Sequence, residues 1–232
     1  MPGKVYLIPA PIAEDTSVIP EGTRKVIASL DYFLVEHVRT ARRYLAGLKI
    51  FASVEALKFE TLNKDTSVAQ LQELFQPVFQ GVSAGIISES GCPGVADPGA
   101  AAVTFAHDNG IEVVPLTGPS SIILALMASG LNGQSFCFHG YLPVKEKEAA
   151  RRISALEKES ALKKCAQIFI ETPYRNNRLF NLLLRNLSAS TRLCVALDIS
   201  GKNERIVTRS IGNWKKARIT WPRLPAVFLF QA

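Results

Sequence analysis

Short apolar runs alternate with segments of helical spacing in the first half of the chain, and this alternation constrains the fold more than any other feature. The runs are KVYLIPA, YFLVE, GVSAGIIS and IEVVPL, of the kind found in strands buried in a parallel sheet. Helix-like segments accompany them at residues 21–30, 39–48, 66–80 and 99–110. This order predicts an α/β fold in which helices cover a largely parallel sheet.

Two of the expected helices have distinctive apolar patterns. The segment 66–80 places apolar side chains on one face, although Pro77 should kink or shorten it; these side chains are Val68, Leu71, Leu74, Phe75 and Val78. The segment that Pro119 opens is apolar nearly all round and stops at Gly130. We therefore expect it to be buried between layers.

The second half of the chain has a different pattern. A charged helix is expected from about Lys145 to Lys164, followed by CAQIFIE and by a helix that Thr172-Pro173 opens. The last four strand-like runs, CAQIFIE, RLCVALDIS, ERIVTRSI and PAVFLFQA, include hairpin partners, which predicts a second, mixed sheet. The expected domains are residues 1–116 and 117–232.

Composition narrows the class of protein. A chain of 232 residues that is 47% hydrophobic can bury a sizeable core. Its four cysteines are single and it has only three histidines, so we expect neither a metal site nor a disulfide framework. The N-terminus lacks the apolar core of a signal peptide and no apolar run reaches membrane-spanning length. We expect a cytoplasmic, reduced protein.

Charge is distributed unevenly between the two halves. Residues 1–117 carry 9 basic and 13 acidic side chains, whereas residues 118–232 carry 18 basic and 7 acidic ones. Such an excess is typical of a face that meets a polyanion, with RNA favoured over an acidic small molecule or a lipid surface. An ordinary solvated surface is the alternative.

The stretch IISESGCPGVADPGAAAV, residues 86–103, joins an apolar strand to a helix through a loop of glycines and prolines. Asp97 can cap that helix and Pro98 fits its first turn. Such loops lie at the carboxyl edge of an open sheet, where ligands of α/β proteins bind, and small residues let a ligand approach the backbone. The P-loop and GxGxxG signatures are absent.

An ordered set of motifs extends this interpretation. They are LIPAPI (7–12), VEHVRTARRYL (35–45), IISESGCPGVADPG (86–99), VVPLTGPSSIILALMASGL (113–131), FHGYLPVK (138–145) and IFIETPYR (168–175). The set resembles the tetrapyrrole methylase superfamily, and within it the branch that methylates a ribose 2′-hydroxyl of a cytidine in small-subunit rRNA. The chain looks like a short form of that branch, without the C-terminal module of longer members.

The resemblance implies two α/β domains, the first with a mostly parallel sheet and the second with a mixed one. It implies an S-adenosylmethionine-dependent methyltransferase with the cofactor in the cleft between the domains, and a homodimer. The residues implied to bind the cofactor are Pro11, Ile12, Ser88, Glu89, Ser90, Gly91, Cys92, Pro93, Ser120, Ser121, Glu171, Thr172, Leu197, Pro225 and Ala226. Of these, Ser88 to Pro93 should hold the methionine part, and Glu89 should be buried in the loop.

The resemblance also indicates where substrate and chemistry lie. Glu36 is the expected general base for the ribose hydroxyl, and Arg39 should hold the adjacent phosphate. A surface ion-pair cluster of these residues with Arg43 is the alternative. The side chains expected to contact RNA are Arg43, Lys145, Lys147, Arg151, Arg152, Arg175 and Arg178.

Departures from the family pattern leave other functions open. The usual PIGNL-type turn is PIAEDT here, and the usual GTP is Gly91-Cys92-Pro93. These changes leave the expected cofactor site largely intact but bear on the RNA target. The alternatives are a tetrapyrrole carbon methyltransferase and a non-catalytic RNA-binding protein on the same scaffold.

Overall fold

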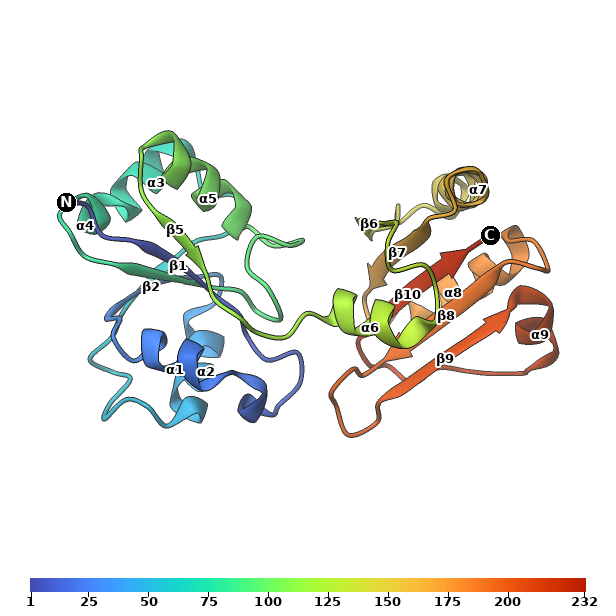
Figure 1. Ribbon diagram of the computed structural model, residues 1–232, viewed down its shortest axis with the longest axis horizontal. Coiled ribbons are helices and arrows are strands. Elements are labelled where there is room, and N and C mark those ends of the chain that lie inside the picture. The colour runs from blue at the N-terminus through green and yellow to red at the C-terminus, as the bar shows by residue number, and fades with distance from the viewer. The chain divides into compact units, whose positions relative to one another are not determined.

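A computed structural model describes residues 1–232, and the chain divides into two compact units, residues 1–120 and 121–232 (Figure 1). The first unit has a five-stranded sheet in the order β3-β2-β4-β1-β5, and all its pairings are parallel. The strands are β1 (Val5–Ile8), β2 (Tyr32–Val35), β3 (Lys58–Thr61), β4 (Ala84–Ile87) and β5 (Val113–Pro115). The expected parallel sheet is confirmed.

Helices cover both faces of the first sheet (Figure 1). They are η1 (Thr16–Val18), α1 (Glu21–Ile27), α2 (Val38–Leu48), α3 (Val68–Leu74), α4 (Gln76–Phe79) and α5 (Gly99–Asp108). Strand β2 is apolar throughout because both of its faces are buried. Phe33 and Val35 pack in the core with α1 and α2, whereas Tyr32 and Leu34 pack on the opposite side with α3, α4 and α5. A strand buried on both faces reads as a continuous apolar run.

The segment 66–80 forms two helices, α3 and α4, with Pro77 in the first turn of the second, as its sequence predicts. A capping box between Ser67 and Gln70 begins α3. Val68 was expected on the apolar face, but its side chain is 72% exposed. That expectation is wrong because Val68 occupies the first position of α3, before the helix reaches the core.

The second unit has a mixed five-stranded sheet in the order β6-β7-β10-β8-β9. Strands β6 and β7 are parallel, and the remaining pairings are antiparallel, including the β8–β9 hairpin. The strands are β6 (Phe136–Tyr141), β7 (Ala166–Glu171), β8 (Arg192–Leu197), β9 (Arg205–Ser210) and β10 (Ala226–Gln231). The helices are α6 (Ser121–Ser129), α7 (Glu146–Lys163), α8 (Asn176–Asn186) and α9 (Ile211–Lys216). The expected mixed sheet is confirmed.

Helix α6 differs from its expected burial. Ala125 and Leu126 are buried where the helix contacts β8, β9 and β10, but Ile123 is 44% and Met127 73% exposed. The expectation of a helix buried between layers is therefore wrong within this unit, because α6 meets the sheet along one side only. No helix of the structure is both long enough and apolar enough to cross a membrane.

Candidate functional site

Three loops of the first unit meet at one edge of its sheet. They are residues 9–13 after β1, 88–98 after β4 and 116–120 after β5, and these strands are parallel neighbours. The carboxyl ends of parallel strands lie at the same edge, where ligands of open α/β sheets bind. The Ala10 amide donates to the Gly91 carbonyl at 2.8 Å, and the Gly91 amide donates back at 3.1 Å. The first two loops are therefore joined by main-chain bonds.

Two glycines set how closely these loops approach. Gly91 has a φ of +71°, and a Cβ placed on it would lie 3.6 Å from Ile12 Cγ2 and 3.9 Å from the Pro119 carbonyl oxygen. A Cβ on Gly118 would lie 2.2 Å from Pro9 Cγ, a distance that no side chain can adopt. The backbone at Gly118 therefore packs directly on the Pro9 ring, whereas a side chain at Gly91 would enter the space beside Ile12.

Polar groups inside the 88–98 loop are used to hold its shape. The Ser88 side chain is buried and its Oγ donates to the carbonyls of Ser90 and Gly91 at 3.3 and 3.1 Å. Asp97 Oδ1 accepts the amides of Gly94 and Gly99 at 3.1 and 2.8 Å. Asp97 thus binds the first residue of α5, in keeping with its expected capping role, although Pro98 occupies the cap position.

Cys92 lies between this loop and the segment after β5. Its Sγ is 3.5 Å from the Pro119 carbonyl oxygen. Burial raises the pKa of the Cys92 thiol, while a hydrogen bond with Ser120 acts in the opposite direction. A thiol held protonated in this way is a packing group and a poor nucleophile.

The segment after β2, which carries Glu36, Arg39 and Arg43, contacts the same loop through His37. His37, beside Glu36, has its Nδ1 3.3 Å from Glu89 Oε1. The Glu89 side chain is 39% exposed, so the expectation that it is buried is wrong: the carboxylate leaves the loop towards His37. Glu36 is half-buried without a hydrogen-bond or ion-pair partner, and Arg39 and Arg43 are exposed. The alternative of an ion-pair cluster among these three residues is therefore not observed.

A second set of expected residues meets at one edge of the other unit's sheet. Glu171 at the end of β7 pairs with Ala226 on β10, and Ala226 pairs with Leu197 at the end of β8. The amide of Asp198, next to Leu197, donates to the Pro225 carbonyl at 2.8 Å. Main-chain pairing therefore brings together positions that lie far apart in the sequence.

Glu171 is already engaged by its neighbours. Its Oε1 accepts the Thr172 amide at 2.7 Å and lies 2.8 Å from Nε and 2.6 Å from Nη2 of Arg175. The Glu171 side chain is 5% exposed and that of Arg175 is 25% exposed. Arg175, which was expected to contact substrate, is thus held by the buried carboxylate.

The remaining basic residues expected to meet substrate lie on or near α7. Two of them have acidic partners: Lys145 pairs with Glu148 at 3.4 Å, and Arg178 pairs with Glu146, which also pairs with Arg185. Lys147 and Arg151 are exposed and form no ion pair. This side of the second unit is therefore partly neutralised.

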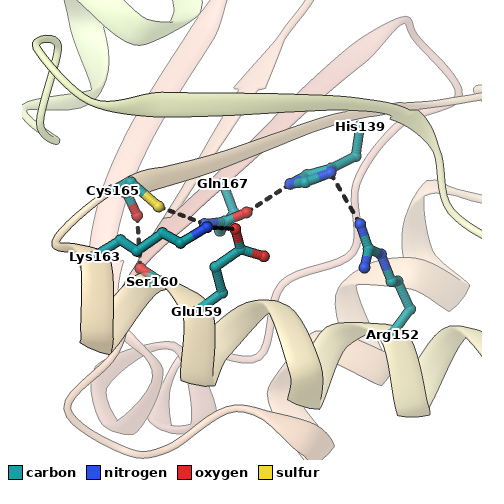
Figure 2. A network of polar contacts seen from close by, with 7 residues as sticks. All are labelled: His139, Arg152, Glu159, Ser160, Lys163, Cys165 and Gln167. Carbon is teal, nitrogen blue, oxygen red and sulfur yellow. Dashed lines mark hydrogen bonds and ion pairs between the residues drawn. The ribbon is translucent and has the colours of Figure 1, made fainter.

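Arg152 takes part in a polar network (Figure 2). Its Nη2 lies 3.3 Å from Nδ1 of His139, whose Nε2 is 2.5 Å from Oε1 of the buried Gln167. Because an amide oxygen only accepts, Nε2 carries the hydrogen and Nδ1 can accept from Arg152. The Gln167 amide nitrogen in turn donates to Cys165 Sγ. Arg152 therefore supports the contact between β6 and α7.

Solved structures show which fold this is. Across the whole chain the structure resembles a uroporphyrin-III C-methyltransferase from Thermus thermophilus, with a TM-score of 0.57 and 16% identity over 93% of that chain. A structure described as the same enzyme complexed with S-adenyl homocysteine matches at a TM-score of 0.56 and 17% identity, covering 99% of this chain and 97% of that one. The fold is that of the tetrapyrrole methylases.

Sequence comparison places the chain within that class, although no protein-family model matches it. It is 33% identical to ribosomal RNA small subunit methyltransferase I of Vibrio cholerae over 87% of this chain and 67% of the relative. It is also 33% identical to the protein of that name from Escherichia coli O157:H7, over 90% of this chain and 70% of the relative. The chain belongs to the ribosomal RNA small subunit methyltransferase I family, which confirms the resemblance seen in its motifs.

Proposed function

We propose that this protein transfers the methyl group of S-adenosylmethionine to RNA of the small ribosomal subunit, at a ribose 2′-oxygen. The observation that carries the proposal is the meeting of Pro11-Ile12, Ser88–Pro93 and Pro119-Ser120 at one sheet edge, in a chain of this family. With no side chain at Gly91, a ligand can approach the backbone of this loop closely. When bound, the cofactor supplies an electrophilic sulfonium methyl.

The proposed cofactor residues fall into two groups. In the first unit they are Pro11, Ile12, Ser88, Glu89, Ser90, Gly91, Cys92, Pro93 and Ser120, and the loops that carry most of them are tied together by main-chain bonds. In the second unit they are Ser121, Glu171, Thr172, Leu197, Pro225 and Ala226. Glu171 is fixed by Arg175, so Thr172 and the backbone beyond β7 have a rigid position.

The residues after β2 are proposed to act on the substrate. A ribose hydroxyl is a poor nucleophile while protonated, and the Glu36 carboxylate, which no neighbour occupies, can accept its proton. Arg39 and Arg43, exposed on α2, can hold an adjacent phosphate. Alignment of acceptor and donor supplies much of the remaining rate enhancement.

Carbon methylation of a tetrapyrrole is the second candidate function, because the uroporphyrin-III C-methyltransferases share this fold. Its polycarboxylate substrate would also favour a basic surface. A labelling experiment separates the two candidates: purified protein is incubated with methyl-labelled S-adenosylmethionine and either unmodified small ribosomal subunits or uroporphyrinogen III.

We expect label in the rRNA and none in the tetrapyrrole. Once the labelled nucleotide is mapped, an RNA with a 2′-deoxy sugar at that position should accept no methyl group. Transfer to the deoxy substrate at an undiminished rate would show that the base is modified. Label in neither substrate, with intact RNA binding, would favour a non-catalytic RNA-binding protein.

We also propose that the protein acts as a cytoplasmic homodimer. The motifs that it shares with its family support this assembly, and α6 exposes an apolar side chain, Met127, that a second copy can cover. Light scattering at micromolar concentration should give twice the mass of one chain. A monomer under those conditions would contradict the proposal.

A further inference from the structure

The basic excess of the second unit is concentrated in the segment 202–223. This segment holds seven lysines and arginines and a single acid, Glu204. The seven side chains are Lys202, Arg205, Arg209, Lys215, Lys216, Arg218 and Arg223, and all are exposed. None of them forms an ion pair, and Glu204 instead accepts the Ser200 amide at 2.7 Å. The α7 segment 145–164, by contrast, holds seven cations against four acids.

The fold gathers these cations into one continuous part of the second unit. Strand β9 is an edge strand of the sheet, and α9 follows it directly (Figure 1). Arg205 and Arg209 are four residues apart on β9, so they point to the same face. Between them lies Val207, which packs against the core that contains Trp214 and Trp221.

Tryptophan rings hold both arginines in place. Cζ of Arg209 lies 5.0 Å from the centroid of the Trp214 ring, and Cζ of Arg205 lies 5.3 Å from that of the Trp221 ring. The two rings are buried and their centroids are 5.8 Å apart, and Trp214 Nε1 donates to the Leu193 carbonyl. Guanidinium groups ordered before binding lose little entropy when they contact phosphate.

An exposed aromatic side chain adjoins the same surface. Tyr174 is 80% exposed, and the Arg223 guanidinium lies 5.5 Å from its ring. Cations beside an exposed aromatic ring are the arrangement with which proteins hold single-stranded RNA, because phosphates pair with the cations and a base stacks on the ring. No other large apolar side chain is exposed in this segment, whereas a membrane surface would require several.

We propose that β9, α9 and residues 217–223, together with Tyr174, form the surface that binds the backbone of the substrate RNA, with Tyr174 stacking an unpaired base. The proposal rests on the proposed function for the identity of that RNA. It replaces α7 as the principal contact, since the cations near α7 are partly paired with acids.

The test compares two variants that remove the same charge. One changes Lys215, Lys216, Arg218 and Arg223 to glutamine, and the other changes Lys147, Arg151, Lys158 and Lys164. All eight side chains are exposed and lack ion pairs. Binding of a labelled single-stranded RNA of about 20 nucleotides is followed by fluorescence anisotropy at several salt concentrations. Circular dichroism checks that both variants are folded.

We expect the first variant to bind about tenfold or more weakly and its salt dependence to become shallower by about 0.7 in log–log slope per lost contact. The α7 variant should retain most of its affinity. Tyr174→Ala should weaken binding by about 5- to 150-fold without changing the salt slope.

Three results would overturn the proposal: equal losses in both variants, a larger loss in the α7 variant, or binding to phosphatidylserine vesicles in preference to RNA. Since the assay needs no methyl transfer, it is independent of the proposed chemistry. If the protein transfers no methyl group but still binds RNA through this surface, the proposed function is refuted and the proposed RNA-binding surface is not.

Discussion

The loop edge of the first unit and the basic surface of the second are built on opposite principles. Residues 9–13, 88–98 and 116–120 contain no lysine or arginine, and they are held by main-chain bonds and by backbone that packs on Pro9. The segment 202–223 has seven cations on exposed side chains. We therefore propose that the first region selects its ligand by shape and that the second attracts its ligand by charge.

This difference agrees with the two ligands proposed. S-adenosylmethionine carries a sulfonium and an ammonium group against one carboxylate, so its reactive end is repelled by cations. A loop edge free of lysine and arginine avoids that repulsion, whereas RNA binding is strengthened by each cation that contacts a phosphate. Cofactor binding at the loop edge should therefore weaken when a side chain adds volume there, and it should hardly depend on salt concentration. RNA binding at the basic surface should depend strongly on salt concentration and little on added volume.

The largest expected effect tests whether chemistry belongs to the first unit. Glu36→Gln keeps the shape of the side chain but removes the proton acceptor, so we expect methyl transfer to slow by about 10²–10⁴-fold. Cofactor and RNA binding should be unchanged. Glu73→Gln is the matched control, because Glu73 is exposed on α3 and forms no ion pair. If Glu36→Gln transfers the methyl group at the normal rate in a single turnover, Glu36 is not the general base.

The next largest effect tests whether the loop edge of the first unit is sensitive to added side-chain volume. Gly91→Leu should weaken cofactor binding by about tenfold or more, because a side chain would enter the space beside Ile12 and the positive φ adds roughly 1–2 kcal/mol of strain. RNA binding should stay the same. Gly133→Leu is the control, since a Cβ there meets nothing within 4 Å. Titration calorimetry showing equal affinity in both variants would remove the 88–98 loop from the site.

The sequence predicts the two sheets well where strands are buried. Runs such as YFLV form strands whose side chains all pack, so pattern and structure coincide. Strand β3 was not recognised, because Lys58–Thr61 is an edge strand with mostly exposed, partly polar side chains. The apolar pattern also overestimates the burial of α6, because periodicity does not reveal which sides of a helix contact other elements.

The candidate site was predicted to a different degree in each unit. Motifs indicated the loops that meet near Gly91, but the pairing of Glu89 with His37 and of Glu171 with Arg175 depends on side-chain directions that no motif carries. The sequence reveals the basic excess of the second half, but the expected RNA contacts there, such as Lys145, Arg151 and Arg178, lie on or near α7. The signal for 202–223 was present as seven cations to one acid, yet their distribution over a strand, a helix and a loop concealed it.

The smallest expected effect concerns the contribution of the Arg209–Trp214 contact to the stability of the second unit. Arg209→Met keeps the apolar stem but loses the charge over Trp214, which should lower the free energy of unfolding by about 0.5–1 kcal/mol. Urea denaturation followed by tryptophan fluorescence reports on the second unit alone, because both tryptophans lie there. Lys215→Met is the control, since Lys215 is exposed on α9 and contacts no ring. If the two variants unfold at the same urea concentration, the contact with the Trp214 ring adds nothing measurable to the stability of this surface, and Arg209 serves RNA binding alone.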